Sequence, residues 1–549
     1  MVENVLDFWF SNQNSWILMK GKKRDEFDKI ISEQFGKLLD VYEASSIDDI
    51  ISEKEVTKLI EIILCLDQFS RHIYRTTSYK RIEINTVKAV KISMYLIDNY
   101  FDIIMNLNHN YMVFILMPLK HNNILKYMPK MMKTFERIEK FGSLDKTLIN
   151  KFKQDSLKKY LDNIDLNKIL ILNKGTSWYN DRKIDKVCEF YPQMKRFTDL
   201  NDNKCILYDS INNYYSKFIE AKKVIISLSG GPDSMVLAYI LKKLSIHSIN
   251  KFTVEAIHIN YKNRTQSDIE ESMISKFCKF HNISLFTVSI PFMRRNNIPR
   301  EFYEKETRKL RFNIYKMFNA PVILGHIKED LIENIWTNIS KGNSLFNLHK
   351  ISEIDIIESV KIFRPFCRIN KDEIFKYAHA NNIPYLKDTT PDWSNRGKMR
   401  KEFIPASHKQ FGEAIDTKII EMSDNLKAYK RLIDSKILKP FYDSITNIDS
   451  GLKCNIKDVI DLDVLMWDDI LTKLFHMTDV SKPSLKSVKN YKDMLERNQE
   501  GVVNFNKLTY CYLENNILYV FNRQKLYDKF SMTIFKSSHW KLIKENMNI

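Results

Sequence analysis

A serine- and glycine-rich segment in the middle of the chain brings together the residue types that bind phosphate groups. Residues 229–234 read Ser-Gly-Gly-Pro-Asp-Ser, after an apolar run at 224–228 and before an apolar helical pattern from Met235. This order predicts a strand, a tight turn and the start of a helix. Two adjacent glycines let backbone N–H groups approach a ligand, and a helix N-terminus attracts anions. We therefore predict a phosphate-binding loop formed by Ser229, Gly230, Gly231, Pro232, Asp233 and Ser234.

Asp233 adds a carboxylate to this loop. Mg²⁺ at phosphate sites takes one or two carboxylates together with phosphate oxygens and water, so Asp233 is the predicted Mg²⁺ ligand. Pro232 suits the first position of a helix, where its missing N–H would have no partner in any case. No Gly-Lys-Ser/Thr sequence closes the loop, which excludes the Walker type.

The loop opens a region in which predicted strands and helices alternate. Further strands are expected at 253–260, 285–290 and 321–325. Strand–helix alternation predicts a doubly wound parallel sheet that binds its ligands at the carboxyl ends of the strands. His258 and Arg264 lie near one such end, and we expect them in the same site as the loop.

Two carboxylates follow the strand at 321–325. Asp330 and Glu333 are three residues apart, so a helix would show both to one ligand. A solvated helix face has the same spacing and stays an alternative. His326 nearby could bind Zn²⁺, but no further set of His or Cys ligands accompanies it.

Basic residues recur in two other segments. Arg308 shares one predicted helix face with Glu304 and Arg311, where a surface ladder of ion pairs would look the same. Residues 383–400 carry two prolines and then a basic cluster, as in a flap that closes over phosphates; a plain surface loop is the alternative. The basic cluster comprises Arg396, Lys398 and Arg400.

The loop resembles the pyrophosphate loop (PP-loop) of the N-type ATP pyrophosphatases. Together with the helix from Glu304, the Gly-His-x-x-x-Asp-x-x-Glu turn from Gly325 and the Arg-Pro-Phe at 364–366, residues 205–400 are similar to the tRNA(Ile)-lysidine synthetases. That family usually reads Asp-Pro-Ser-Asn and Arg-Asn-x-x-Arg where this chain has the different sequence at 388–400, a departure that bears on substrate choice more than on ATP use.

This resemblance implies a reaction and a set of roles. ATP would adenylate the wobble cytidine of a tRNA(Ile), and free lysine would then displace AMP, with pyrophosphate released in the first step. The loop and His258 would bind ATP; Asp330, Glu333 and Arg308 would bind lysine; Lys398, Arg400 and Arg264 would hold tRNA or phosphate. The residues implied to be catalytic are Asp233, Asp330, Arg308 and Arg396.

Two alternatives use the same loop. One is adenylation followed by another nucleophile, such as sulfur in tRNA thiolation, against which the absence of any C-x-x-C argues. The other is a non-catalytic scaffold that only holds a nucleotide. A scaffold would lose no turnover when Asp233 is replaced by Ala.

Helical periodicity dominates the N-terminal third. Residues 5–10, 27–28, 66–75 and 117–121 resemble a bacterial family of unknown function, number 924, which implies a tetratricopeptide-like helical array. A cluster of polar residues could line an anion or peptide groove, although a network of ion pairs around an aromatic core is the favoured interpretation. The cluster comprises Asp67, Arg71, His72 and Arg75. The Lys-rich stretch at 151–195 is expected to be a junction.

Length and composition bound the remaining possibilities. A chain of 549 residues suggests about three domains. We expect an all-α domain at 1–195, an α/β ATP pyrophosphatase domain at 205–400 and a small α+β, tRNA-binding region at 401–549. In the last region, helices are predicted at 411–432 and 484–496, the second with Ser481 as a possible cap, and strands at 502–505 and 517–521.

Charge and cysteine usage point the same way. The net charge of +18 suits a polyanionic partner such as tRNA, although an AT-rich coding bias explains part of the lysine excess. Seven scattered cysteines argue against a disulfide scaffold, a zinc ribbon or an iron–sulfur site. No apolar run reaches membrane-spanning length, so we expect a cytoplasmic protein with no membrane partner. The sequence carries no signal for an oligomeric state.

Overall fold

The fold is that of a computed structural model of the full chain. It forms two compact units, unit 1 with residues 1–326 and 353–389, and unit 2 with residues 327–352 and 390–549. The structure describes residues 4–11, 22–141, 146–173, 184, 188–189, 194, 205–247, 251–262, 266–290, 292–293, 298–342, 348, 351–386, 395–530 and 539–546.

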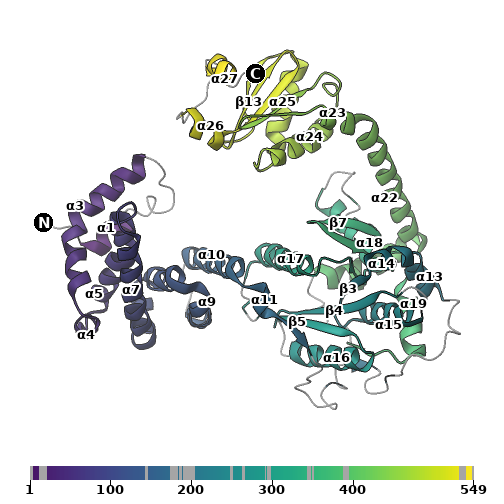
Figure 1. The fold of residues 1–549 in the computed structure, drawn as a ribbon, viewed down its shortest axis with the longest axis horizontal. Helices are drawn as coiled ribbons and strands as arrows, with labels where there is room; N and C mark the ends of the chain where they lie inside the picture. Colours follow the sequence, from purple (N-terminus) through teal and green to yellow (C-terminus); the bar gives the residue numbers. More distant parts are fainter. Residues whose placement is uncertain are drawn as a thin grey trace. The chain divides into compact units, whose positions relative to one another are not determined.

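Unit 1 contains a seven-stranded sheet in the order β1-β5-β4-β3-β6-β8-β7. Figure 1 labels four of these strands, β3, β4, β5 and β7. The five central strands run parallel, and the two edge strands are antiparallel to their neighbours. The predicted parallel arrangement is confirmed for the centre, but the sheet as a whole is mixed. The strands are β1 (Leu170–Asn173), β3 (Lys223–Ser227), β4 (Thr253–Asn260), β5 (Ser284–Ser289), β6 (Val322–Ile323), β7 (Ile354–Ile357) and β8 (Val360–Phe363).

The carboxyl end of β3 lies where the strand order reverses. From β3 the sheet extends through β4 and β5 on one side and through β6 and β8 on the other. Ligands of open α/β sheets bind outside such a switch point. The predicted phosphate loop follows β3 directly and leads into α15 (Pro232–His247).

Helices cover both faces of this sheet. Side chains alternate between the faces of a strand, and Ile225, Ile257 and Val288 share one apolar core with α17 (Arg300–Met317). On the sheet, α15 packs against β3 and β4, and α16 (Ser267–Phe280) packs against β4 and β5. The other elements of this region are α13 (Ile206–Asn212), α14 (Tyr215–Ala221), α19 (Lys371–Ala380), β2 (Cys188–Glu189) and β9 (Tyr385–Leu386).

The N-terminal part of unit 1 is helical, as predicted, and its finer description as tetratricopeptide-like stays a prediction. An aromatic core holds Trp9 and Phe69 at 5.5 Å between ring centroids. The helices are α1 (Val5–Ser11), α3 (Lys22–Ala44), α4 (Ile47–Ser52), α5 (Val56–Ile63), the π-helical turn η1 (Leu64–Phe69), α6 (Ser70–Ile73), α7 (Tyr79–Asn99), α8 (Phe101–Leu107), α9 (Tyr111–Lys140), α10 (Thr147–Asn163) and α11 (Leu166–Ile169).

The expectation of a junction at 151–195 is wrong for its first part. Helix α10 packs against α9 and α17, Lys309 Nζ lies 2.7 Å from Asp162 Oδ1, and β1 pairs with β5. The Lys-rich composition misled the prediction: Lys151 and Lys158 are exposed on α10, but Phe152 and Leu157 on the same helix are buried.

Unit 2 ends in a five-stranded antiparallel sheet in the order β10-β11-β14-β13-β12. One face packs against α24 and α25 through Cys511 and Val520, and the other packs against Trp540 of α27 through Tyr519 and Phe521. The elements are β10 (Thr446–Ile448), β11 (Gly451–Asn455), α24 (Val464–Met477), α25 (Leu485–Glu496), β12 (Gly501–Val503), β13 (Thr509–Glu514), β14 (Ile517–Asn522), α26 (Arg523–Phe530) and α27 (Trp540–Asn546).

The other elements of unit 2 are helical. Helix α18 packs against α22 through an apolar cluster that includes Ile332, Ile335 and Ile420. These helical elements are α18 (Lys328–Ser340), α20 (Asn395–Lys398), the π-helical turn η5 (Met399–Phe403), α21 (Ile404–Phe411), α22 (Ala414–Ile433), the π-helical turn η6 (Asp434–Leu438) and α23 (Lys439–Asp443). Across the described residues of both units, none of the helices combines the length and apolarity needed to cross a bilayer.

A buried histidine makes the stability of unit 1 depend on pH. His281 is 4% exposed, and the centroid of its ring lies 5.4 Å from that of Tyr239. Burial, together with the charge of Lys242, lowers the pKa of His281 from 6.5 to about 4. As the pH falls, His281 therefore becomes protonated in the unfolded chain before it does so in the folded protein. Its neutral, buried form contributes fully to the free energy of unfolding above pH 6.5, and this contribution is lost as the pH falls toward 4.

We expect the free energy of unfolding to fall by about 2 kcal/mol from this residue between pH 7 and pH 5. Urea titrations of the protein and of His281→Gln at both pH values measure the difference. The variant should lose less stability on acidification than the parent; equal losses would contradict the assignment.

Candidate functional site

The loop after β3 folds around two serine hydroxyls. Ser234 Oγ lies 3.1 Å from Ser229 Oγ and donates to the carbonyl of Gly231 at 3.1 Å. It also accepts from the backbone N–H of Ser229 at 3.3 Å. These bonds hold the loop in shape before any ligand binds, and preorganised donors are what stabilise developing charge.

Gly230 occupies a backbone conformation that side chains disfavour. Its φ is +83°, and a Cβ on it would lie 2.5 Å from Cδ1 of Leu386. The carbonyl of Gly230 accepts from the N–H of Leu386 at 2.8 Å, so β9 holds the loop from one side. The turn thus requires glycine at position 230 for two reasons, the positive φ and the close approach of Leu386.

Gly325 presses against the same loop from β6. A Cβ on Gly325 would lie 2.9 Å from the backbone N of Ser234 and 3.0 Å from the carbonyl carbon of Asp233. Both atoms belong to the backbone at the start of α15, which cannot swing aside as a side chain can. Glycine therefore lets β6 approach the helix N-terminus, where unpaired amides and the helix dipole favour anions.

His258 and Asp233 flank the loop with opposite chemistry. His258 is buried, and its Nδ1 lies 2.9 Å from the carbonyl oxygen of Leu228. Burial lowers the pKa of His258, against the smaller effects of that backbone bond and of nearby carboxylates. Asp233 Oδ2 lies 3.2 Å from Nζ of Lys371.

Asp233 is suited to be a single protein ligand of the predicted Mg²⁺. Lone carboxylates beside phosphate are typical of Mg²⁺, which takes its other ligands from phosphate oxygens and water. Among the residues that the structure describes, no group of three His, Cys, Asp or Glu forms an all-protein metal cage. The donor set therefore fits only an ion that arrives with the nucleotide.

In unit 2, the two predicted carboxylates of α18 pair with two arginines. Arg396 Nε donates to Glu333 Oε2 at 2.9 Å, and Arg400 Nη2 donates to Asp330 Oδ1 at 3.2 Å. Arg396 also bonds to Asp330, and Arg400 also bonds to Glu333. The other oxygen of Asp330 accepts from the N–H of Ile327 at 3.1 Å, which caps α18.

This pairing forms a four-member ion cluster at a partly exposed surface. The side chains of both carboxylates are 9% exposed, whereas that of Arg396 is 55% exposed. Burial alone would lower the pKa of Arg396, but the charges of Asp330 and Glu333 outweigh it and the net shift is upward. In this structure the pair of carboxylates is thus neutralised by two guanidinium groups of the chain itself, whose planar shape suits carboxylate oxygens.

The remaining predicted residues belong neither to the loop nor to the ion cluster, or lie outside the residues that the structure describes. Arg308 on α17 is exposed, with its guanidinium carbon 4.9 Å from the ring centroid of Phe312. Lys398 on α20 is exposed. Arg264 and residues 387–394 lie outside the described residues. His326 Nδ1 accepts from Arg364 Nε at 3.1 Å.

Comparison with known families decides what this region is. Residues 204–407 match the family model of the PP-loop domain. This region is a PP-loop domain. Residues 5–165 match the model of a bacterial protein of unknown function, DUF924. The expected resemblances, of the middle of the chain to the PP-loop enzymes and of its N-terminal part to family 924, are therefore confirmed.

Relatives of the PP-loop domain include curated enzymes. The chain is 27% identical over 246 residues to the tRNA(Ile)-lysidine synthase of Clostridioides difficile, covering 43% of this chain and 52% of that protein. It is 30% identical over 242 residues to the tRNA(Ile)-lysidine synthase of Clostridium tetani, covering 42% of this chain and 50% of that protein. The chain thus spans about half the length of these relatives.

A solved structure also resembles part of the chain. It is a U34-tRNA thiolase from Methanococcus maripaludis with its [4Fe-4S] cluster, at 19% identity and a TM-score of 0.33, covering 40% of this chain and 80% of that one. A likeness this slight supports no statement about activity.

Sequence reasoning missed several residues that shape the PP-loop. Lys371 and Leu386 reach the loop from positions more than 130 residues away along the chain, and no local pattern signals such contacts. Gly325 was identifiable only as a glycine at a strand end, a signal for close backbone approach. Lys371 sets the charge beside Asp233, and the other two residues fix the loop's position.

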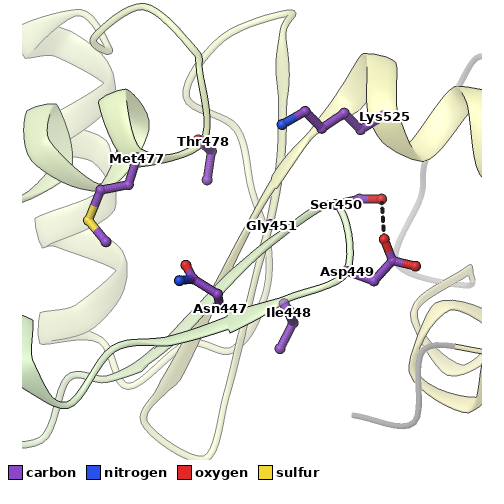
Figure 2. A pocket seen from close by; sticks show the side chains of 8 residues that line it. All are labelled: Asn447, Ile448, Asp449, Ser450, Gly451, Met477, Thr478 and Lys525. Atoms are coloured by element: carbon purple, nitrogen blue, oxygen red, sulfur yellow. Dashed lines mark hydrogen bonds between the residues drawn. The ribbon is translucent and has the colours of Figure 1, made fainter.

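A hollow of about 600 Å³ lies in unit 2, away from every predicted site residue of that unit (Figure 2). It opens between the β10–β11 hairpin, the end of α24 and Lys525 of α26. Its polar groups include Ser450 Oγ, which donates to Asp449 Oδ1 at 3.2 Å. We assign no chemistry to it, because one lysine beside an exposed hairpin gives neither an acid–base pair nor a nucleophile.

Proposed function

We propose that this chain is an ATP-dependent tRNA-modifying ligase that adenylates the wobble cytidine of tRNA(Ile) and joins lysine to it, releasing pyrophosphate and AMP. The observation that carries the proposal is the loop after β3, whose serine hydroxyls and glycines preorganise the N-terminus of α15 for a phosphate ligand. Relatives named tRNA(Ile)-lysidine synthase, 27% and 30% identical over 246 and 242 residues, also support the proposal.

In the first step, the C2 carbonyl oxygen of the cytidine attacks the α-phosphorus of ATP. The bond to the β-phosphate oxygen breaks, and pyrophosphate leaves with its electron pair. The amides and hydroxyls of Ser229, Gly231 and Ser234 would hold the leaving group at the N-terminus of α15. A bound Mg²⁺ would neutralise phosphate charge, with Asp233 as its protein ligand.

In the second step, the ε-amine of lysine attacks C2, and the C–O bond to the AMP oxygen breaks. Asp330 and Glu333 would hold the incoming ammonium, which must lose its proton to become a nucleophile. In the structure, each of the two carboxylates already binds both arginines. Lysine would therefore compete with Arg396 and Arg400, and a proton could pass to Asp330 only after an arginine moves away.

The other assigned roles complete the proposal. Arg308 would contact the substrate from α17, and Arg400, Lys398 and Arg264 would contact phosphates of tRNA, each contact adding to the salt dependence of binding. The wobble base must leave the stack of the anticodon loop to react, as single-stranded bases do in RNA recognition.

Replacing Asp233 by Ala tests the proposal. We expect formation of AMP in the presence of tRNA and lysine to fall about 100-fold or more, because the Mg²⁺ ligand and the partner of Lys371 are both lost. Asp372→Ala, which removes an exposed aspartate on α19, is the matched control and should keep full activity.

Two results would contradict the proposal. Full AMP formation by Asp233→Ala would show that Asp233 takes no part in the reaction. If the protein is instead a non-catalytic scaffold, neither the parent nor Asp233→Ala would form AMP. AMP formation that depends on a persulfide donor, and not on lysine, would favour tRNA thiolation.

A further inference from the structure

A buried carboxylate lies among cations in the N-terminal helical region of unit 1. Asp67 on η1 is 0% exposed. Its oxygens accept from His121 Nδ1 at 2.8 Å, from Arg71 Nη2 at 3.3 Å and from Gln68 Nε2 at 2.5 Å. Burial alone would raise the pKa of Asp67, but His121 and Arg71 outweigh it and the pKa is lowered. The carboxylate is thus ionised and satisfied by the protein.

Two lysines add positive charge that this carboxylate does not balance. Lys159 of α10 donates through Nζ to the carbonyl of Lys120 at 2.9 Å. Burial lowers the pKa of Lys159. The charge of Arg71 lowers it further, while that of Asp67 raises it, so Lys159 belongs to the same cluster as these two residues. Burial also lowers the pKa of Lys120, partly offset by the exposed carboxylate of Asp155.

Several donors in this cluster are not used. Arg71 donates through Nη2 to Asp67 and to Thr86 at 2.8 Å; its Nη1 and Nε find no acceptor in the described part of the chain. His121 uses only Nδ1 toward described residues. Lys120 Nζ lies 5.0 Å above the ring of Phe152. The side chains of Arg71 and His121 are 29% and 23% exposed, so a small ligand can reach them.

Both backbone segments that carry the cluster are distorted at this place. Asp67 lies in the π-helical turn Leu64–Phe69. Helix α9 breaks at Asn123, with φ −151° and ψ 92°, two residues after His121. Asn123 Oδ1 then accepts from the N–H of Lys126 at 3.0 Å and restarts the helix. Such irregularities cost free energy and are found most often at functional sites.

A second polar network nearby lacks this excess of charge. Asp28 accepts from Arg75 Nε at 3.0 Å, and one of its oxygens lies 2.6 Å from His72 Nδ1. The ring of His72 in turn contacts the rings of Phe27 and Trp9. The sequence grouped Asp67, Arg71, His72 and Arg75 in a single cluster, whereas the structure separates them into two. For His72 and Arg75 the favoured interpretation, an ion-pair network at an aromatic core, matches the contacts.

We propose that Arg71, His121, Lys120 and Lys159 form a binding site for a phosphoryl group. Three lysine and arginine charges face one buried aspartate, and Asp155 offsets at most one more, so the site has a net positive charge. A phosphoryl group carries between one and two negative charges near neutral pH and has several strong acceptor oxygens. It can therefore accept hydrogen bonds from the planar guanidinium of Arg71 and balance more positive charge than one carboxylate does. This site is independent of the proposed ligase reaction.

Labelling of lysines in the full-length protein tests the proposal. The protein is treated with acetic anhydride in chloride or in inorganic phosphate at equal ionic strength, and acetylation of each lysine is quantified by mass spectrometry. Labelling of Lys120 and Lys159 should fall about tenfold when phosphate reaches ten times its dissociation constant, because only unliganded protein reacts. Lys158, exposed on the same helix, should label equally in both salts.

Variants separate binding from folding. Lys159→Gln leaves the contacts of Asp67 intact, and we expect it to weaken the protection of Lys120 by phosphate about tenfold or more. Lys158→Gln is the matched control and should keep the protection. Unchanged labelling in phosphate, equal protection in Lys159→Gln, or protection by single-stranded RNA with none by phosphate would each overturn the proposal.

Discussion

Gly325→Ala is expected to lower the rate of AMP formation about 100-fold, because the displacement of a preorganised site by a fraction of an ångström has effects of this size. The added Cβ would lie 2.9 Å from the backbone N of Ser234, a distance that real Cβ atoms do not adopt. Either β6 or the start of α15 must move, and the serine hydroxyls move with α15. The measurement is steady-state release of AMP with tRNA and lysine at saturating ATP.

Gly36→Ala is the matched control for this substitution. Gly36 lies in α3, and a Cβ on it meets nothing within 4 Å. This variant should keep full activity, and both variants should show the circular dichroism of the parent. Wild-type rates in correctly folded Gly325→Ala would show that the loop's position is not set by β6.

Asp330→Asn should raise the KM for lysine about 10- to 100-fold, the range expected when a hydrogen bond to a charged group is lost. The amide oxygen of Asn can still accept from the N–H of Ile327, so the start of α18 is preserved. Adenylation of tRNA measured without lysine should change little, because the substitution removes charge only from the amine site. Initial rates across a lysine titration give the KM.

Glu329→Gln controls for removal of a charge from the same helix. Glu329 precedes Asp330 by one residue and therefore lies on another face of α18. Its KM for lysine should match that of the parent. An unchanged KM in Asp330→Asn, or an equal rise in both variants, would contradict the role given to the carboxylate pair.

Local pattern predicted the centre of the sheet and the loop well. The apolar run of β3, Val224–Ile226, is continuous and fully buried, as is typical of a parallel strand that is covered on both faces. Strand β1 also carries an apolar run, Leu170–Leu172, but it lies at an edge, where Ile171 is 61% exposed. Its pairing with β5 joins residues over 100 positions apart, and no local pattern signals that pairing.

The C-terminal region shows the same limits. Helix α25 was predicted to end at Glu496, as it does, but its N-cap is Ser484, whose Oγ accepts from the N–H of Ser487 at 3.2 Å. The predicted strands near 502 and 517 are confirmed, whereas β10, β11 and β13 were not anticipated. Strands β11 and β13 flank β14, and such pairing depends on segments distant in sequence.

The candidate site divides along the same line. The loop residues are contiguous, so strand, turn and helix signals predict their geometry together. The carboxylates at 330 and 333 and the arginines at 396 and 400 were each identified from spacing, but their mutual pairing joins segments more than 60 residues apart. Sequence spacing indicates which groups are available and leaves open which of them neutralise one another.

The most direct test of the central claim follows the fate of ATP. Purified protein is incubated with radiolabelled ATP, tRNA(Ile) transcript and lysine, and the products are separated. We predict AMP and pyrophosphate in equal amounts, dependent on the tRNA, with lysine incorporated at the wobble cytidine. Formation of ADP and phosphate instead, or no AMP with any tRNA supplied, would contradict it.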